Sequence, residues 1–495
     1  MIQEIIAFVL YLGIMIYIGI RFMGKNNNSE DFFLGGRNLS PWTTALSAEA
    51  SDMSGWLLMG LPGVAYLTGM KEAFWTAVGL EIGTYLNWLI IAKRLRKYSV
   101  LCNNSITIPE FLTNRFKDEK NIISSISALF IVLFFIVYTA SGFVACAKLL
   151  NSVFNLPYIC GLLIGVVVIL LYTLLGGFSA VCTTDSIQGS LMFVALIITV
   201  CIMTVTLGGP NGAAEKVSAF GSQFLNPFSA EGDKSFGAMS IISSLAWGLG
   251  YSGMPHILVR FMGIRSNKEI KVSRRIAMVW VTIAMFSAII IGALAKAYLL
   301  APLEDGKQET VIISTLLQTY QPFIAGVFLC AILAAAMSTA DSQLLVAASA
   351  FSEDFCQNIL KRKFEPKTMV LVSRITVLCI ALIAFVISLD ENSSIFSLVS
   401  YAWAGFGATF GPLIFLALFW RNATAKGAVA GIIAGGLTVV IWHNIPASIA
   451  PIFGLYEILP GFILCLLFAV VVSLLDKNKN PQMLEEFDAY KALED

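Results

Sequence analysis

Acidic and hydroxyl side chains interrupt the apolar run at residues 39–65. Glu49 and Asp52 lie one helical turn apart, and Ser54 and Gly55 follow directly. Ionisable groups inside a membrane span are costly, so they need partners and commonly mark an ion or substrate path. We therefore expect a broken helix that binds a small cation or solute here. The alternative is an ordinary helix whose small residues pack against its neighbours.

A second polar cluster lies within the apolar run at residues 322–350. It contains Ser338, Thr339, Asp341 and Ser342. Hydroxyl and carboxylate oxygens are ligands that hard cations prefer. Each hydroxyl taken alone is equally well explained by a bond to the carbonyl four residues back. The cluster as a whole predicts a site for a small cation.

The third unusual stretch combines aromatic residues with helix breakers. Residues 247–256 contain three glycines and Pro255, a combination that cannot hold a regular helix. Trp247 and Tyr251 are four residues apart and share a helix face. The stretch predicts a second break lined by aromatic side chains. A glycine-packed, proline-kinked helix is the alternative.

Four further positions carry weaker signals. Tyr138 lies near the middle of the apolar run at 122–150, where a tyrosine more often serves packing than binding. Asp185 precedes the run at 186–207, where it either caps a helix or joins an ion path. His256 and His443 show no metal-ligand spacing and are interpreted as structural.

The composition excludes several classes of protein. Of the 495 residues, 57% are hydrophobic and only 13% are charged, against about 25% in soluble proteins. A soluble enzyme, a disordered chain and a nucleic-acid binder are therefore excluded. The nine cysteines form no CxxC pair, so neither a disulfide framework nor a zinc site is expected. No nucleophile–base or metal-ligand constellation appears, so we expect neither enzymatic activity nor a cofactor.

Thirteen apolar windows are long enough to cross the hydrocarbon core, which takes about 20 residues. They lie at residues 4–22, 39–65, 73–92, 122–150, 156–176, 186–207, 237–258, 276–300, 322–350, 369–388, 393–419, 424–446 and 455–475. The second and seventh windows carry the two predicted breaks, as the first helices of two five-helix repeats would. Residues 1–475 are expected to form one membrane domain, and residues 476–495 a short cytoplasmic tail.

The basic residues predict the orientation. With thirteen spans and the N-terminus outside, all but six of the 32 Lys and Arg residues fall on the cytoplasmic side, Arg260 among them. The six on the outer side are Lys71, Lys148, Lys216, Lys234, Lys296 and Lys307. Because basic residues accumulate in cytoplasmic loops, we expect the N-terminus outside and the C-terminus inside the cell.

Four stretches resemble the sodium/solute symporter family, and its bacterial sodium/proline branch in particular. They are LGGRNLSPWTTALSAEASDMSGWLLMGLPG at 34–63, AWGLGYSGMPHILVRFM at 246–262, AILAAAMSTADSQLLV at 331–346 and SYAWAGFGATFGP at 400–412. The resemblance extends over essentially the whole chain. It implies an all-α integral membrane protein of the bacterial cytoplasmic membrane, with about thirteen transmembrane helices. Its leucine-transporter-like core, at about residues 39–419, would consist of two inverted repeats, spans 2–6 and 7–11.

The resemblance also implies sodium-coupled symport of L-proline into the cell by alternating access, with Na⁺ as the coupling ion. Another small solute, such as a different amino acid or pantothenate, is the first alternative. A channel or a membrane sensor is an alternative of a different class, but no selectivity-filter repeat or added signalling domain is visible. Beyond proline, sodium and the lipid bilayer we expect no nucleic-acid partner and no obligatory protein partner.

Site residues follow from the same resemblance. For sodium it implies the carbonyls of Ala50, Met53 and Ala335 and the hydroxyls of Ser338 and Thr339. For proline it implies Ser54, Gly55, Tyr138, Trp247, Tyr251 and Pro255. Asp52 matches an aspartate essential for sodium-coupled uptake, and Arg37 matches a cytoplasmic-side arginine linked to coupling.

Asp341 departs from the family pattern, in which a hydroxyl or small residue is common at this position. With Ser342 and Asp185 it outlines a second cation position or an exit path. The alternative is a carboxylate that is satisfied locally by Ser342 and Gln343. We favour the structural or exit-path role.

Overall fold

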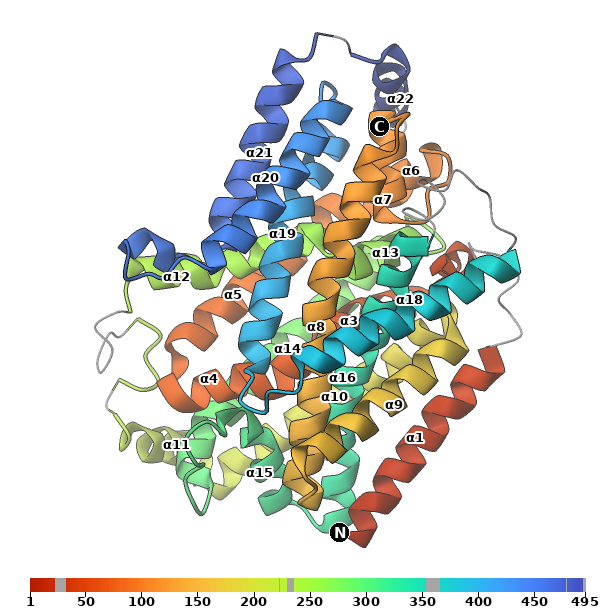
Figure 1. The fold of residues 1–495 in the computed structure, drawn as a ribbon. Helices are drawn as coiled ribbons and strands as arrows, with labels where there is room; N and C mark the ends of the chain where they lie inside the picture. The colour runs from red at the N-terminus through yellow and green to blue at the C-terminus, as the bar shows by residue number, and fades with distance from the viewer. Residues whose placement is uncertain (23–32, 222, 229–235, 353–365, 478, 493–495) are drawn as a thin grey trace.

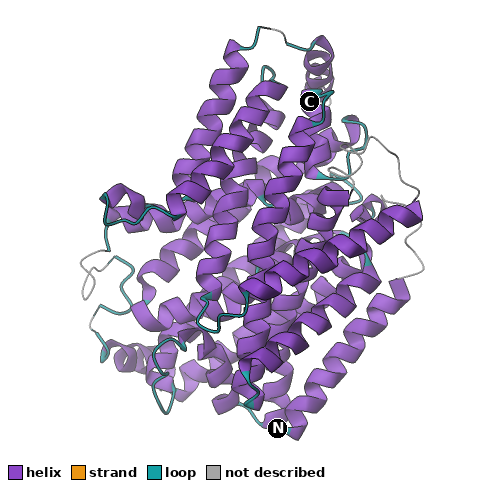
Figure 2. Cartoon of the chain, viewed as in Figure 1, coloured by secondary structure: helices purple, strands orange, loops and turns teal. Residues whose placement is uncertain are grey.

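The computed structural model of the chain describes residues 1–22, 33–221, 223–228, 236–352, 366–477 and 479–492. The described residues form helices joined by short loops, with one isolated backbone bridge and no strand (Figure 2). The start of the chain and its last helix lie at opposite ends of the molecule (Figure 1).

Most of the thirteen predicted windows coincide with one continuous helix each. These are α1 (Ile2–Phe22), α8 (Ile122–Phe154), α9 (Tyr158–Gly176), α10 (Phe178–Thr206), α14 (Ile270–Tyr298), α16 (Pro322–Ser349), α18 (Pro366–Ile387), α19 (Ile395–Phe419), α20 (Ala425–His443) and α21 (Ile458–Leu475). Eight of the described helices are long and apolar enough to cross a membrane. The prediction of an all-helical membrane protein is therefore confirmed.

Each of the remaining three windows consists of several helical segments. The second window consists of α3 (Pro41–Asp52), the π-helical turn η3 (Trp56–Gly60) and α4 (Leu61–Thr68). The third consists of α5 (Met70–Leu86), the π-helical turn η4 (Asn87–Ile91) and α6 (Ala92–Leu101). The seventh consists of α12 (Ala238–Ala246), the 3-10 segment η5 (Trp247–Gly253) and α13 (Pro255–Gly263). The third helix thus extends nine residues beyond its predicted end.

Shorter helices cover the ends of the bundle. They are α7 (Ile108–Phe116), α11 (Gly209–Ser218), α15 (Val311–Thr319) and α22 (Pro481–Ala492). The last of these is the C-terminal tail, and it packs against α6.

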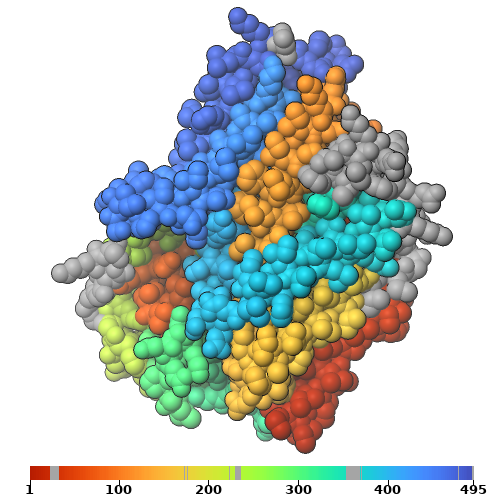
Figure 3. Space-filling view, viewed as in Figure 1, coloured from red at the N-terminus to blue at the C-terminus, as the bar shows by residue number. Residues whose placement is uncertain are grey.

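The lipid-facing surface is apolar. On the face shown in Figure 3, α1, α9 and α18 lie side by side. Large apolar side chains on these helices are exposed, among them Val9, Leu171 and Leu382. Exposed apolar patches of this kind mark a membrane or protein contact, and on a helical bundle of this hydropathy they indicate the bilayer.

Local sequence explains where the two half-helices α3 and α13 begin. The Ser40 hydroxyl accepts a hydrogen bond from the Thr43 amide, and Pro41 takes the first helical position of α3. Pro255 takes the same position in α13. A short backbone bridge joins the two: the Leu39 amide donates to the Gly263 carbonyl, and the Arg265 amide donates to the Leu39 carbonyl, both at 3.1 Å. Helices α3 and α13 are therefore directly connected at their ends.

Glycine permits the closest helix contact around η5. A Cβ atom on Gly248 would lie 2.2 Å from the carbonyl oxygen of Gly79 on α5. A Cβ on Gly83 would meet the Gly248 carbonyl at 2.3 Å. The glycines of the seventh window thus bring the backbone of η5 against α5, in addition to weakening the helix.

Candidate functional site

The first predicted break is present at residues 53–55. Helix α3 ends at Asp52, and the backbone of Met53 leaves the helical region with ψ 70°. The Ser54 amide donates to the Asp52 carbonyl at 2.9 Å, and the helix resumes only after Gly55. A Cβ on Gly55 would lie 2.8 Å from the Ala145 side chain on α8, so the break packs tightly against that helix.

The second predicted break is present at residues 247–254. Met254 is extended, with ψ 105°, and separates η5 from α13. Two side chains from other helices donate hydrogen bonds to the backbone of η5. The Trp403 indole donates to the Trp247 carbonyl at 2.7 Å, and the Asn87 amide donates to the Tyr251 carbonyl at 3.1 Å. Backbone carbonyl groups inside a membrane protein need hydrogen-bond partners from the protein itself, and these two side chains supply them for the irregular segment η5.

Asp52 is the point at which the two breaks meet. The Tyr251 hydroxyl donates to Asp52 Oδ2 at 2.6 Å, across 199 residues of sequence. The Asp52 carbonyl accepts from the Tyr138 hydroxyl at 3.3 Å and from the Trp56 indole at 3.1 Å. The Asp52 side chain has no exposed surface. The structure therefore brings Asp52, Tyr138 and Tyr251 together, as expected for residues of one site.

Trp247 lies in an aromatic cluster beside this centre. Its ring centroid is 6.0 Å from that of Trp56, which follows the first break. Three further rings surround it: those of Phe396 and Trp403 on α19, at 5.1 and 6.4 Å, and that of Tyr456, at 5.3 Å. The sequence analysis assigned no site role to these four neighbours. The aromatic residues of the stretch at 400–412 were the available signal for Trp403.

Three of the predicted sodium residues are hydrogen-bonded to one another across α3 and α16. Ser338 on α16 donates to the Ala50 carbonyl on α3 at 2.8 Å, and it lies 3.3 Å from the Ala335 carbonyl. The neighbouring Thr339 hydroxyl is buried and has no hydrogen-bond partner among the described residues. Met53 is buried at the break itself. Carbonyl and hydroxyl oxygens from two facing helices form a donor set that suits a small hard cation.

The π-helical turn η4 contributes a further pair of donors. Asn87 bonds to the second break, as described above, and the adjacent Trp88 indole donates to Glu49 Oε1 at 3.0 Å. Single π-turns inside α-helices frequently occur at functional sites. Here the turn directs two consecutive side chains at the two broken helices. Nothing in the amino-acid pattern of residues 87–91 indicated it.

Arg260 occupies the region predicted for a second cation. The sequence analysis counted it among the cytoplasmic charges, but its side chain is 1% exposed and lies inside the bundle. Its Nη2 is 3.0 Å from Asp185 Oδ2 and 2.6 Å from Ser342 Oγ. The Ser342 hydroxyl lies 3.3 Å from Asp341 Oδ1. The structure therefore brings Asp185, Asp341 and Ser342 together and adds an arginine that the sequence analysis missed.

Gln343 does not bond to Asp341. Its side-chain oxygen accepts from Thr139 on α8 at 3.4 Å. The local pairing considered for Asp341 thus involves Ser342 and not Gln343.

Arg37 lies apart from these residues, toward the end of the molecule that carries α22. Its guanidinium donates to the Met262 carbonyl at 2.9 Å, to the Ser105 carbonyl at 2.7 Å and to the Asn104 side chain at 3.0 Å. It thereby joins the segment before α3 to α13 and to the loop after α6. A residue that links the half-helices α3 and α13 to a neighbouring loop is well placed to act on their movement.

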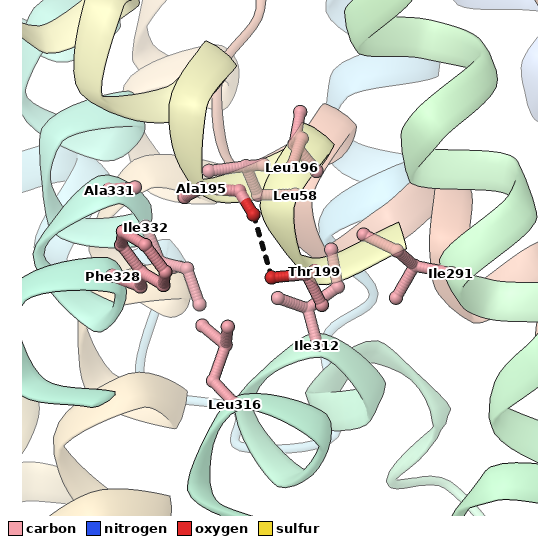
Figure 4. A pocket seen from close by; sticks show the side chains of 10 residues that line it. All are labelled: Leu58, Ala195, Leu196, Thr199, Ile291, Ile312, Leu316, Phe328, Ala331 and Ile332. Carbon is pink, nitrogen blue, oxygen red and sulfur yellow. Dashed lines mark hydrogen bonds between the residues drawn. The ribbon is translucent and has the colours of Figure 1, made fainter. Parts of the chain in front are cut away.

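Two cavities lie away from the site. One has a volume of about 10 Å³, enough for a single water molecule, and its lining includes Leu58, Leu196 and Leu316. Thr199 is its one polar lining residue, and it already donates to the Ala195 carbonyl at 2.6 Å (Figure 4). The other, of about 360 Å³, is an apolar groove between α1, α8 and α9. Neither offers the polar groups that an ion or a zwitterion requires.

Comparisons with known proteins place this geometry in a family. The sequence model described as "Sodium:solute symporter family" matches residues 32–435. The chain is 43% identical over 480 residues to the "Osmoregulated proline transporter OpuE" of Bacillus subtilis, covering 96% of both chains. It is 42% identical over 488 residues to the "Sodium/proline symporter" of Escherichia coli, covering 98% of this chain and 95% of the relative.

Solved structures show the same fold. A Na⁺-coupled sialic acid symporter, solved in a substrate-bound outward-open state, aligns with a TM-score of 0.80 at 19% identity, covering 97% of this chain and 99% of the other. The nucleobase-cation-symport-1 family transporter Mhp1 aligns with a TM-score of 0.52 at 12% identity, covering 93% and 98%. The leucine-transporter-like fold predicted above is confirmed.

Proposed function

Because the chain belongs to the sodium:solute symporter family, we propose that it carries L-proline into the cell together with sodium, by alternating access. It is a transporter and not an enzyme. The observation that carries the proposal is the bond between Tyr251 and Asp52, which joins the two broken helices beside the predicted sodium ligands. Full-length relatives named sodium/proline symporter support the choice of solute.

The chemistry of proline suits the region between the breaks. Its carboxylate would be held by backbone N–H groups near Ser54 and Gly55, where the positive end of a half-helix dipole points inward. Its compact apolar ring would pack against Trp247 and Tyr251, and Tyr138 and Pro255 would complete the wall. The secondary ammonium gains a favourable contact with an aromatic face.

Sodium would bind between α3 and α16. We assign its ligands to the carbonyls of Ala50, Met53 and Ala335 and to the hydroxyls of Ser338 and Thr339. Thr339 supports this assignment because a buried hydroxyl without a partner costs free energy that an ion would recover. Asp52 would not coordinate sodium directly. It would stabilise the broken backbone after α3 and contribute its negative charge to the field at the site.

Binding of sodium would fix the break after α3 and so order the proline site. Solute binding would then close the outer gate, and the two helix bundles would rock to open the site inward. Arg37 would act on the cytoplasmic side, where it links the half-helices α3 and α13. A ligand shifts such an equilibrium only by its differential affinity for the two states.

The sodium gradient is large enough to drive accumulation. One sodium ion moving down a tenfold gradient releases about 1.4 kcal/mol. A membrane potential of about 140 mV adds roughly 3.2 kcal/mol for each positive charge. Together these terms support accumulation on the order of a thousandfold. We place the protein in the bacterial cytoplasmic membrane, with its N-terminus outside and its C-terminus inside.

The test is uptake of radiolabelled proline into proteoliposomes, with and without an inward sodium gradient at clamped voltage. We expect concentrative uptake only with sodium. Trp247→Ala should raise the proline concentration for half-maximal uptake at least about tenfold, because one aromatic wall of the site is lost. The control is Trp442→Ala. Trp442 lies near the end of α20, and its indole donates to the Leu455 carbonyl.

Failure of wild-type uptake would refute proline as the solute. In that case a panel of small amino acids and pantothenate, offered under the same gradient, would identify the solute. If Trp247→Ala transported proline with unchanged affinity, the binding site would lie elsewhere.

A further inference from the structure

Two fully buried carboxylates are linked by one arginine in the interior of the bundle. Asp185 belongs to α10, Asp341 to α16 and Arg260 to α13. The guanidinium contacts Asp185 directly at 3.0 Å. It reaches Asp341 through Ser342, whose hydroxyl lies 2.6 Å from Arg260 Nη2 and 3.3 Å from Asp341 Oδ1. Four of the bundle's helices contribute to this cluster, since α3 supplies Ser47.

The oxygens in contact with Arg260 are of the kind that a sodium ion would use. Ser47 Oγ lies 2.8 Å from Arg260 Nε and 2.6 Å from Asp185 Oδ2. Hydroxyl and carboxylate oxygens from three helices thus surround a positive charge that the protein itself supplies. Arginine stays protonated in proteins, so this charge is permanent.

A sodium ion cannot share this position with the guanidinium. It would need the oxygens of Ser47, Asp185 and Ser342, each of which already faces an N–H group of Arg260. It would also lie within a few ångströms of a like charge in a water-poor interior, where repulsion is much stronger than in water. Among the described residues, the Ser338 hydroxyl and the Ala50 carbonyl bond to each other and not to Arg260, so a small cation can still bind there.

We propose that Arg260 is a tethered cation that occupies a second ion position and thereby limits the transporter to one sodium ion per cycle. The inference rests on the proposed sodium coupling but not on the identity of the solute. Arg260 is also a positioning residue, because its Nη1 donates to the His256 carbonyl on its own helix while the other nitrogens bond to α3, α10 and α16.

The test is equilibrium binding of radioactive sodium to the purified full-length protein in detergent, counted as ions per polypeptide, with no solute present. We expect one ion in the wild type. In Arg260→Met the number should double, because Ser47, Asp185, Asp341 and Ser342 lose the competing cation. Asp185 Oδ1 and Asp341 Oδ2, which are buried without a hydrogen-bond partner among the described residues, would then be available as ligands.

Two variants control for the charge and for the site. Arg260→Lys keeps a tethered cation and should bind one ion. The double variant Arg260→Met with Asp185→Asn removes a carboxylate from the opened position and should also bind one. A structural role alone would change the stability of these proteins but not the ratio of sodium to protein.

Either of two results overturns the inference: two sodium ions bound to the wild type, or one ion bound to folded Arg260→Met. A count of two in the wild type overturns the inference even if the variants fail to fold. Because no solute is added, this outcome is separate from that of the uptake experiment. Loss of proline uptake with a single bound sodium would refute the solute and leave the role of Arg260 standing.

Discussion

Ser338 and Thr339 are neighbours on α16 but differ in their bonding. The Ser338 hydroxyl donates to the Ala50 carbonyl, whereas the Thr339 hydroxyl is buried with no partner among the described residues. A buried hydroxyl left unsatisfied costs about 1–3 kcal/mol, so an ion that bonds to it recovers free energy. The Ser338 hydroxyl therefore links α16 to α3, whereas the Thr339 hydroxyl is available to coordinate an ion.

Replacing both hydroxyls should weaken sodium binding without loss of the fold. For Ser338→Ala combined with Thr339→Ala, we expect the sodium concentration for half-maximal uptake to rise at least about tenfold, as the loss of roughly 1.4 kcal/mol predicts. The matched control is Ser349→Ala on the same helix, whose hydroxyl bonds only to the Val346 carbonyl at 2.8 Å. An unchanged sodium dependence in the double variant would show that sodium binds elsewhere.

At the scale of elements, the C-terminal helix α22 is docked onto the end of the bundle. Its Tyr490 ring stacks on Tyr98 of α6, with centroids 4.1 Å apart and planes 4° from parallel. Asp488 accepts two hydrogen bonds from Arg421 at 2.7 Å each, and Glu486 lies 3.0 Å from the Cys102 sulfur. The tail thus covers the loop that follows α6, which also contacts Arg37.

Removing residues 481–495 should expose the Cys102 thiol. Burial, together with the adjacent Glu486 carboxylate, raises the pKa of Cys102 in the intact protein. Without the tail the pKa should fall toward its ordinary value, and the thiolate fraction near neutral pH should rise. In detergent-solubilised protein with its other cysteines replaced by alanine, we expect maleimide labelling to accelerate at least about tenfold.

Cys146 provides the comparison for this experiment. It is buried on α8 within the bundle, so its labelling as the single remaining cysteine should not respond to removal of the tail. If Cys102 reacted equally slowly with and without the tail, α22 would not be the element that covers it.

At the scale of the whole molecule, the arrangement of the termini agrees with an odd number of spans. The first residues of α1 and the tail helix α22 lie at opposite ends (Figure 1). The excess of basic residues on one side predicts which end faces the cytoplasm. Arg260 and Arg115 are both fully buried, but without them the remaining charges keep the same bias.

Cysteine labelling in intact cells would test this orientation. Asp305 and Lys268 are both exposed, in loops on opposite sides of the predicted topology. We expect Asp305→Cys to react with a membrane-impermeant maleimide added outside. Lys268→Cys should react only after the membrane is permeabilised. The reverse pattern would invert the proposed orientation.

The membrane class, the thirteen windows and the positions of both breaks could be predicted from the amino-acid pattern alone. Hydropathy and the conformational limits of glycine and proline act within a few residues, so Gly55 and Pro255 mark the breaks without knowledge of the fold. The resemblance to a family then supplied candidate ligands such as Ser338. The extension of the third helix to Leu101 through a π-helical turn was missed, since nothing local to that segment indicates it.

Which of these groups contact one another depends on the packing of the folded chain. The bond from Tyr251 to Asp52 joins residues 199 positions apart, and that from Ser338 to Ala50 spans 288. The same holds for Arg260, whose type and position are typical of a cytoplasmic loop but whose partners on α3, α10 and α16 draw it into the interior. A buried charge is tolerated only where oxygens from other segments compensate it, and the packing of those segments is a property of the whole chain.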